Sequence, residues 1–532
     1  MILRSAEKPA ATLAKAPQQH INVAPSFCPY IRRPVMNKIE ELKIERDGLD
    51  VGKKIETFAQ QGWETIPEGD IERLKWHGIF ARKHTPGFFM MRIRIPNGIA
   101  SVDQARMLAQ ISRQFGRGLM DITTRQQLQL RWIRIEQVPE ILRRLQEAGL
   151  TSLQTGMDTI RNVVGCPVAG IGRDELLDAT PVVYQFTSMF VGNRAFTNLP
   201  RKFNVVITGC TLNCTHAESQ DLGLTPATRE IDGKPIAGFN VQIGGKMGSG
   251  GYRIASPLDL FVRPEEAAEI CALIAMIYRD HGPREARSLG RLAFLIDEWG
   301  IERFQQELTH RAGRLLEHAG RDARKAQSAD HIGIYRQQEA GLNYAGLVVP
   351  VGRITADQLL ELARLSERYG RGELRFTVGQ NVIIPHISDT QLGDFLAEPL
   401  LQTFRYDPDE LMRGLVTCTG NDYCNMAMID TKGRALEVVQ ALSEKLPGVP
   451  PVTVHWSGCP AGCGNHQGAN IGLQGTKTRI NDKTVEAVNI FVGGRSGPKP
   501  QVGQMIMADV PCSQLADVMK GLVQFYPRKK PT

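Results

Sequence analysis

Apolar and polar positions follow the same order along two separate stretches of the chain. Residues 87–133 and 341–387 align without a gap, and fourteen of the forty-seven aligned positions are identical. Each stretch begins with a predicted strand that ends at Pro-x-Gly and continues into an amphipathic segment such as residues 105–115. A Gly-Arg-Gly stop then precedes an alternating, β-branched segment. We therefore predict strand, turn, helix, turn and strand in each copy.

A second pair of similar segments lies further along the chain. TGCTLNCTH at residues 208–216 resembles SGCPAGCGNH at residues 457–466, and NVQIGGKMG at 240–248 resembles NIFVGGRSG at 489–497. Both pairs are separated by the same 249 residues. The chain therefore consists of two copies of one α+β unit of roughly 250 residues, and we expect a pseudo-twofold arrangement with a site at the junction of the halves.

The two copies differ at positions that could carry chemistry. Three arginines of the first copy have no basic counterpart in the second: Arg92 aligns with Gly346, Arg125 with Gly379, and Arg131 with Pro385. The second copy instead has an additional pair of cysteines. Random drift on solvated surfaces is the alternative interpretation, but three changes on two predicted strands argue against it.

Composition and charge exclude several classes of protein. The 532 residues allow two to four domains, and no apolar run approaches the roughly 20 residues of a membrane span. We find no zinc finger, helix-turn-helix or arginine-rich run, so we expect neither a membrane nor a nucleic-acid partner. Ten cysteines in so long a chain do not indicate a disulfide scaffold, and we expect a cytoplasmic protein. Residues 1–36 are expected to form a disordered leader, with organelle targeting as the alternative.

Four cysteines in the second copy have the spacing of a metal site. Cys418-x5-Cys424 is followed, after thirty-four residues, by Cys459-x3-Cys463. Two close pairs of thiolates suit either tetrahedral zinc or a four-iron cluster. The five-residue gap is wide for a zinc knuckle, and the glycine-rich second pair could donate amide hydrogen bonds to cluster sulfides. The sequence therefore favours a cluster, with zinc and unligated cysteines as alternatives.

These motifs resemble those of the assimilatory nitrite and sulfite reductase family. The resemblance rests on TCTGNDYC and HWSGCPAGCGNH and extends from about residue 60 to 525. It implies an α+β fold with internal duplication, in which two ferredoxin-like half-domains accompany two domains that bind sirohaem and a 4Fe–4S cluster. By position, Cys418, Cys424, Cys459 and Cys463 would bind the cluster, and Cys463 would also join it to the sirohaem iron.

The resemblance also implies a division of the chain into segments. Residues 37–150 would hold the N-terminal segment and the first ferredoxin-like half-domain, and residues 151–335 the domain with the substrate and sirohaem cations. Residues 336–405 would form the second half-domain, and residues 406–532 the domain of the cluster.

Basic residues on the predicted strands are candidates for an anion site. Arg92 and Arg94 alternate on one strand, and we predict that Arg125, Gln129 and Arg131 share one face of the next. The resemblance implies that nitrite or sulfite is bound by four residues: Arg92, Arg161, Lys202 and Asn204. It implies that the carboxylates of sirohaem are bound by five more: Thr123, Arg125, Gln129, Arg131 and Arg201. Guanidinium groups pair well with carboxylates, which gives the surplus arginines a function.

One residue of this set bears on the substrate. Sulfite reductases of the family generally have a second lysine two residues after Lys202, where nitrite reductases have asparagine. This chain has Asn204. The resemblance therefore implies six-electron reduction of nitrite to ammonia in nitrate assimilation. A sulfite reductase is the near alternative, and a zinc-stabilised binding protein is the remote one.

The source of electrons is also inferred from what the chain contains. No dinucleotide fingerprint or flavin-binding segment is visible, so we expect a one-electron protein donor. The resemblance implies ferredoxin, which is acidic, and the net charge of +8 is compatible with it. Basic residues near the cluster segment are docking candidates: Lys432, Arg434, Lys477 and Arg479. We expect a monomer.

A further cysteine pair lies in the first copy. Cys210-x3-Cys214 matches the second pair of the quartet, but the first copy offers only Cys166 in place of Cys418 and Cys424. We interpret Cys210 and Cys214 as a vestige of the duplication, with a redox-labile pair as the alternative.

Overall fold

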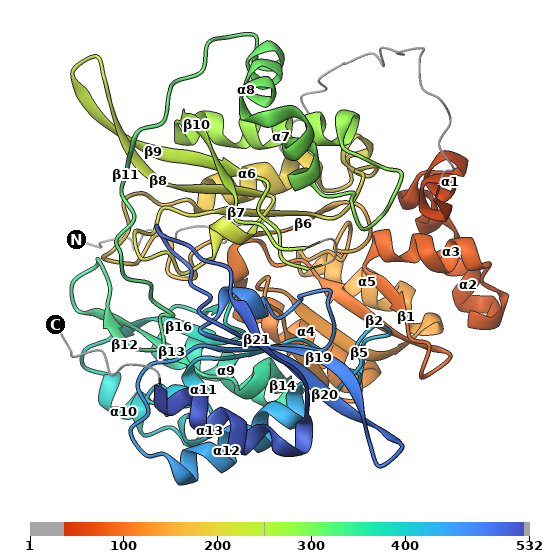
Figure 1. The fold of residues 1–532 in the computed structure, drawn as a ribbon, viewed down its shortest axis with the longest axis vertical. Coiled ribbons are helices and arrows are strands. Elements are labelled where there is room, and N and C mark those ends of the chain that lie inside the picture. The colour runs from red at the N-terminus through yellow and green to blue at the C-terminus, as the bar shows by residue number, and fades with distance from the viewer. Residues whose placement is uncertain (1–36, 249–250, 526–532) are drawn as a thin grey trace, which may run out of the picture.

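Four sheets with covering helices make up the part of the chain that the structure describes, residues 37–248 and 251–525 of a computed structural model (Figure 1). The leader predicted for residues 1–36 lies outside these ranges. The sheets form two similar pairs, which confirms the predicted α+β fold with internal duplication. No helix in the described ranges combines the length and the apolar character of a membrane span.

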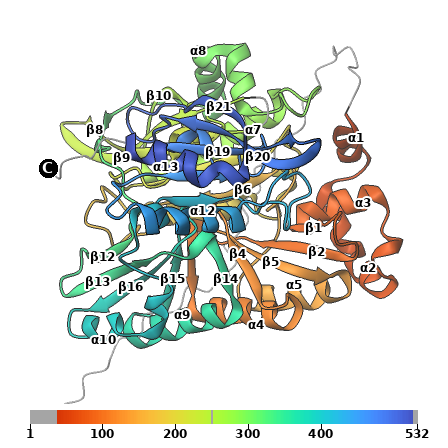
Figure 2. The same ribbon diagram turned by 60° about the horizontal axis from the view of Figure 1, so that its bottom comes forward.

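The first pair consists of two five-stranded antiparallel sheets that lie side by side, with helices below them in the view of Figure 2. The first sheet has the order β1 (Ile79–Ala81), β2 (Phe88–Ile93), β5 (Leu128–Arg134), β4 (Leu119–Ile122) and β14 (Arg353–Thr355). The second has the order β12 (Gly333–Arg336), β13 (Leu342–Leu347), β16 (Val382–Ser388), β15 (Glu373–Phe376) and β3 (Ile99–Ser101). These helices are α4 (Val102–Phe115), α5 (Val138–Glu147), α9 (Ala356–Tyr369) and α10 (Leu392–Leu396).

The two copies exchange edge strands in this layer. β14 of the second copy pairs with β4 of the first, and β3 of the first copy pairs with β15 of the second. Equivalent capping boxes start the two central helices, at Ser101 with Gln104 and at Thr355 with Gln358. Apolar residues of both sheets form one continuous core, so neither half of this layer is closed without the other.

The second pair consists of mixed sheets. One has the order β10 (Ser256–Val262), β9 (Lys234–Ile243), β8 (Leu222–Ile231), β7 (Phe203–Ile207) and β6 (Ile160–Val164), with β11 (Arg321–Asp322) beside β8. The other has the order β17 (Leu415–Thr417), β18 (Val454–Ser457), β19 (Ile471–Ile480), β20 (Lys483–Val492) and β21 (Gln504–Pro511). The long hairpins β8–β9 and β19–β20 have the same bounds after a shift of 249 residues.

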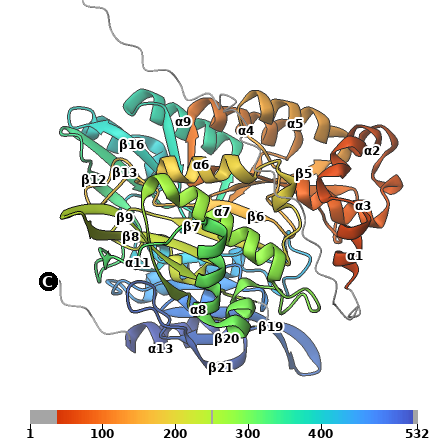
Figure 3. The same ribbon diagram turned by 90° about the horizontal axis from the view of Figure 1, so that it is seen from above.

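Helices flank these sheets, and those of the first copy can be followed in Figure 3. In the first copy they are α6 (Thr180–Phe190), α7 (Pro264–His281) and α8 (Leu292–Ala312). In the second they are α11 (Glu410–Arg413), α12 (Lys432–Lys445) and α13 (Leu515–Phe525). Three short helices precede the first sheet: α1 (Lys38–Glu45), α2 (Ile55–Gln61) and α3 (Glu68–Arg73).

The predicted helix of the first repeat is confirmed by α4, but the segment after it differs from the prediction. A hairpin, β4–β5, replaces the single expected strand. Polar residues 123–127 form its turn, where the Thr123 hydroxyl accepts hydrogen bonds from the amides of Arg125 (3.2 Å) and Gln127 (3.1 Å). Arg125 therefore lies in the turn, and the prediction that it shares a strand face with Gln129 and Arg131 was wrong.

A buried carboxylate connects the two copies at this hairpin. Asp121 on β4 accepts hydrogen bonds from Arg131 Nε (2.9 Å) and from Arg353 Nε of the second copy (3.2 Å), and Lys432 Nζ lies 3.6 Å away. Burial alone would raise the pKa of Asp121, but the three cations hold it well below its usual range. The carboxylate is therefore ionised, and cations from both copies neutralise its charge.

We expect Asp121→Asn to destabilise the protein by about 3–5 kcal/mol, because it leaves buried cations without their counter-charge. The matched control is Asp103→Asn, whose side chain is 89% exposed beside Arg106 and should change stability by less than about 1 kcal/mol. Urea-dependent pulse proteolysis measures both. Because the pKa of Asp121 is lowered, its contribution to the free energy of unfolding is complete above the usual aspartate pKa. This contribution is lost as the pH falls through the lowered pKa of the folded state. Equal stability of the two variants at neutral pH would contradict the assignment.

Candidate functional site

A cavity lies at the junction of the two copies, where the sequence predicts a site. The first copy contributes Thr124, Arg125, Lys202, Asn204 and His216 to its lining, and the second contributes Val416, His455, Cys463, Gly464 and Asn465. The Thr124 hydroxyl donates a hydrogen bond to the Cys463 carbonyl oxygen at 3.2 Å. Two of the predicted anion residues, Lys202 and Asn204, therefore face the same space as the predicted cluster ligand Cys463.

Lys202 and Asn204 reach the cavity from the start of β7. The Asn204 amide donates a hydrogen bond to Asp221 Oδ2 at 2.8 Å, which holds the beginning of this strand against β8. The side-chain oxygen of Asn204 is buried and has no hydrogen-bond partner among the described residues. A buried acceptor without a partner is costly, so this oxygen is suited to a donor on a bound group.

Arg92 and Arg161 converge on one backbone carbonyl. Arg92 Nη1 on β2 donates a hydrogen bond to the Thr155 carbonyl oxygen at 2.9 Å, and Arg161 Nη1 on β6 donates to the same oxygen. Arg161 Nη2 also donates to the Met157 carbonyl oxygen at 2.7 Å. The guanidinium of Arg92 lies over the Phe80 ring, 4.9 Å from its centroid. Backbone oxygens and an aromatic face thus position both arginines but do not neutralise them.

Positive charge accumulates at this site. Burial lowers the pKa of Arg92 to about 9 with a contribution from the charge of Arg125, and burial and neighbouring arginines also lower the pKa of Arg161 and Lys202. None of Arg92, Arg125, Arg161 and Lys202 forms an ion pair with a carboxylate of the described residues. Such a group of cations requires anions from outside the chain. Its composition fits the polycarboxylate sirohaem together with a small anionic substrate.

The other residues that the resemblance assigns to sirohaem have partners inside the protein. Gln129 Oε1 accepts a hydrogen bond from Arg131 Nη2 at 2.6 Å, and Arg131 also bonds Asp121. Arg131 Nη2 further donates to Thr419 Oγ1 at 3.1 Å, directly beside Cys418. Arg201 Nη1 lies 3.8 Å from a carboxylate oxygen of Asp158. Arg131 thus connects the first copy to the cysteine loop of the second.

The four cysteines of the second copy lie on two loops that follow neighbouring parallel strands. Cys418 follows β17, and its sulfur accepts a hydrogen bond from the Gly458 amide at 3.1 Å. Cys424 Sγ accepts one from the Met426 amide at 3.4 Å. Burial, with a contribution from the neighbouring cysteines, raises the pKa of Cys418 to about 11 and that of Cys459 to about 12. These amides donate to cysteine sulfurs, and donation from the glycine-rich loop to cluster sulfides stays a prediction.

The spacing of these sulfurs distinguishes between the two metals that the sequence left open. Among the described residues, the metal-ligating side chains whose ligand atoms lie within 4.8 Å of one another are Cys166, Cys210, Cys214 and His331. The quartet of the second copy is not one of these compact groups. A four-iron cluster needs wider spacing because each thiolate binds a different iron, whereas one zinc ion draws its ligands together. The quartet fits the cluster.

The compact group was missed from the sequence. Cys210 and Cys214 were interpreted as a vestige of the duplication, but the structure brings them together with Cys166 and His331. The histidine follows no strand motif and lies far from the cysteines in the chain. The only available signal was the occurrence of Cys166 beside a C-x3-C pair.

One predicted docking residue is buried instead. Lys432, at the start of α12, is 1% exposed and donates a hydrogen bond to the Val351 carbonyl oxygen. It belongs to the group of cations around Asp121, so its assignment to a docking surface was wrong. Lys477 and Arg479 on β19 are exposed, as the prediction requires.

Comparison with known proteins gives the same assignment for nearly the whole chain. The family model for the nitrite and sulphite reductase 4Fe-4S domain matches residues 156–316 and 409–532. The model for the nitrite/sulfite reductase ferredoxin-like half domain matches residues 81–148 and 335–401. Each model matches twice, in agreement with the internal duplication.

Individual relatives are similar along most of their length. A ferredoxin–nitrite reductase of Synechococcus elongatus is 47% identical, with 92% of this chain and 96% of the relative covered. A chloroplastic ferredoxin–nitrite reductase of Spinacia oleracea is 40% identical, with 92% and 85% covered. The structure of the Mycobacterium tuberculosis NirA protein superimposes with a TM-score of 0.87 at 30% identity, covering 94% and 95% of the two chains. The chain belongs to the nitrite and sulfite reductase family, whose members combine a 4Fe–4S domain with ferredoxin-like half-domains.

Proposed function

We propose that this chain is a ferredoxin-dependent nitrite reductase, which reduces nitrite to ammonia with six electrons. The observation that carries the proposal is a group of four cations without carboxylate partners, Arg92, Arg125, Arg161 and Lys202, of which Arg125 and Lys202 line one cavity with Cys463. A small anion is attracted to such a site, and a thiolate next to it can hold a metal cofactor. The names of the relatives support nitrite as the anion and ferredoxin as the donor.

The cofactors of the proposed enzyme are sirohaem and a 4Fe–4S cluster. We assign the cluster to Cys418, Cys424, Cys459 and Cys463, with Cys463 as the ligand shared with the haem iron. We assign the carboxylates of sirohaem to Arg125, Arg131 and Arg201, assisted by Thr123 and Gln129. When bound, sirohaem supplies an electron-rich iron for the nitrite nitrogen, and the cluster supplies electrons one at a time.

Polar residues of the first copy bind the substrate and supply protons in the proposed reaction. Arg92 and Arg161 are fixed by the Thr155 carbonyl oxygen, so their free N–H groups can bind the nitrite oxygens without reorganisation. Lys202 has a lowered pKa, so its ammonium gives up a proton more readily than an exposed lysine would. Asn204 contributes an amide and no charge, which suits a monoanion.

The test of the proposal is turnover of nitrite by the purified holoenzyme with reduced methyl viologen. We expect ammonia as the product and haem-type absorption, together with iron and labile sulfide. Lys202→Met should lower kcat/KM for nitrite by about 10²-fold, because a buried donor to the substrate is lost. The control is Lys53→Met, whose side chain is 81% exposed and should leave the rate unchanged. A colourless preparation, or equal rates for the two variants, would refute the proposal.

Asn204→Lys should raise the turnover of sulfite relative to nitrite. A fifth cation in a site that already has four favours a dianion over a monoanion. Asn204→Ala removes the amide without adding charge, so it should lower nitrite turnover without any gain with sulfite. Both ratios are measured with reduced viologen in variants that keep the wild-type absorption spectrum. An unchanged ratio in Asn204→Lys would count against this role of Asn204.

The rate with ferredoxin should fall several-fold between about 50 and 300 mM salt, because screening weakens attraction to an acidic donor. The rate with viologen should change little over the same range. Lys477→Glu on the hairpin beside the cluster loops should raise KM for ferredoxin. Lys234→Glu, on the equivalent hairpin of the first copy, is the matched control. Similar salt dependence with both donors would exclude electrostatic docking.

A further inference from the structure

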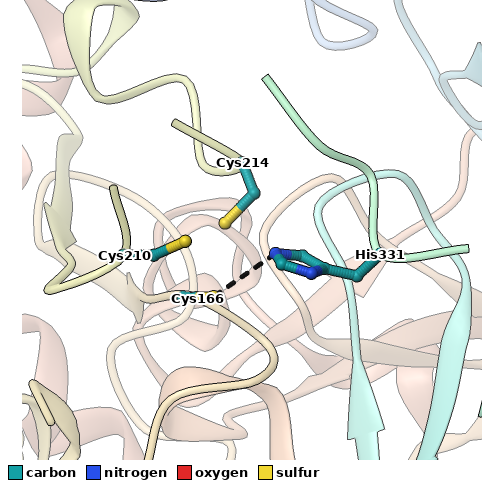
Figure 4. Close-up of side chains that lie close together, drawn as sticks. All are labelled: Cys166, Cys210, Cys214 and His331. Atoms are coloured by element: carbon teal, nitrogen blue, oxygen red, sulfur yellow. Dashed lines mark hydrogen bonds between the residues drawn. The ribbon is translucent and has the colours of Figure 1, made fainter. Parts of the chain in front are cut away.

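A second metal-ligating group lies in the first copy and shares no residue with the proposed cluster ligands. Its members are Cys166, Cys210, Cys214 and His331, whose side chains converge in Figure 4. All four are buried, with exposed fractions of 1%, 2%, 6% and 3%. Their ligand atoms lie within 4.8 Å of one another, and the cysteines are free. Burial of three thiols and an imidazole around one point is the arrangement of a metal site.

We propose that these four residues bind one structural zinc ion. Tetrahedral zinc with bonds of about 2.3 Å to sulfur and about 2.0 Å to nitrogen places a sulfur and a nitrogen ligand roughly 3.5 Å apart. The distance from Cys166 Sγ to His331 Nε2 is 3.5 Å. The three residues between Cys210 and Cys214 are also within the usual spacing of a zinc knuckle. On binding, the three thiols release their protons to solvent and the imidazole stays neutral.

The surroundings orient the ligands as a zinc site requires. Nδ1 of His331 lies 3.1 Å from the hydroxyl oxygen of Tyr344, so the ring can donate its N–H there and keep Nε2 free for the metal. The Leu212 amide donates a hydrogen bond to Cys210 Sγ at 3.4 Å, which stabilises a thiolate. The site therefore has outer partners for both types of ligand.

His331 has an unusual backbone conformation. Its φ is +61°, in the left-handed region that residues other than glycine seldom adopt. A Cβ atom on Gly346 would lie 1.8 Å from the His331 carbonyl oxygen, so only glycine allows this approach. Gly346 is the position that aligns with Arg92 of the first copy. The second copy thus has glycine in place of an arginine where the segment with His331 packs.

The pseudo-twofold relation supports a site with a smaller occupant than the cluster. Cys210-x3-Cys214 and Cys459-x3-Cys463 share an unusual backbone: φ is positive at Asn213 and Gly462, and again at His216 and Asn465. Cys166 follows β6 as Cys418 follows β17. The first copy has no equivalent of Cys424, and a histidine from the segment between the copies completes the group. Three close thiolates and an imidazole suit one ion better than four irons.

The proposed ion would connect parts of the active site. β6 carries Arg161 and ends shortly before Cys166, and β7 carries Asn204 and ends shortly before Cys210. The zinc would fasten the ends of these two strands to the segment that leads into the second copy. It would stabilise the frame of the substrate residues and take no part in electron transfer, because zinc has no redox chemistry.

The experiment is metal analysis of the holoenzyme purified without chelators. We expect about one zinc per chain, with iron limited to the sirohaem and one four-iron cluster. Cys214→Ala should lower zinc to below roughly 0.1 per chain with unchanged haem absorption. Cys271→Ala is the control, since Cys271 is a buried cysteine outside the group and its loss should leave zinc at about one.

Other outcomes would overturn the proposal. They are no zinc in the wild type even after incubation with zinc chloride, zinc retained in Cys214→Ala, iron in excess of both cofactors, or a Cys210–Cys214 disulfide in a peptide map. If Cys214→Ala does not fold, X-ray absorption at the zinc edge of the wild type decides. Three sulfur ligands and one nitrogen ligand are expected, and a shell of oxygen and nitrogen alone would refute the site.

Discussion

Positive charge buried at the junction of the two copies is the constraint on which this structure depends. Arg92, Arg125, Arg161 and Lys202 lie close together at this junction, and the pKa values of all four are lowered because burial and neighbouring cations disfavour their charged forms. The carboxylates nearby are already engaged, as Asp121 is with Arg131 and Asp221 with Arg291. The fold alone thus bears an electrostatic cost that anionic ligands relieve, and this couples assembly of the cofactor to formation of the site.

The duplication makes such an arrangement attainable. Exchange of β3 and β14 between the sheets and a common core hold the copies together independently of the cavity. The mixed sheets can then differ in what their loops carry. The first copy supplies cations on or beside β2, β6 and β7, and the second supplies four cysteines on the loops after β17 and β18. Two identical copies could not supply different groups to one space, because their equivalent loops would carry the same residues.

Much of this could be predicted because periodicity and spacing are local. The helix α4 follows from its amphipathic pattern and glycine stop, and the duplication follows from the similarity of segments 249 residues apart. Arg125 was placed wrongly because the hydroxyl of Thr123 turns the chain, and a turn of polar residues resembles an alternating strand. Lys432 looked like a surface charge because its partners, Asp121 and the Val351 carbonyl oxygen, are remote in sequence. His331 could not be found at all, since only packing brings it to the cysteines.

The last of these residues explains a difference between the copies that drift would leave without a cause. Arg92 and Gly346 occupy equivalent strands, yet the guanidinium of Arg92 donates to the Thr155 carbonyl oxygen, whereas Gly346 lies against the backbone of His331. An arginine at 346 would clash with that carbonyl oxygen, so the segment that joins the copies can approach β13 only where the side chain is absent. The absence of a side chain at Gly346 and the approach of the His331 backbone are therefore coupled in this structure. The two copies thus differ in their cysteines and also at Arg92 and Gly346, where only the glycine allows another segment to pack against the strand.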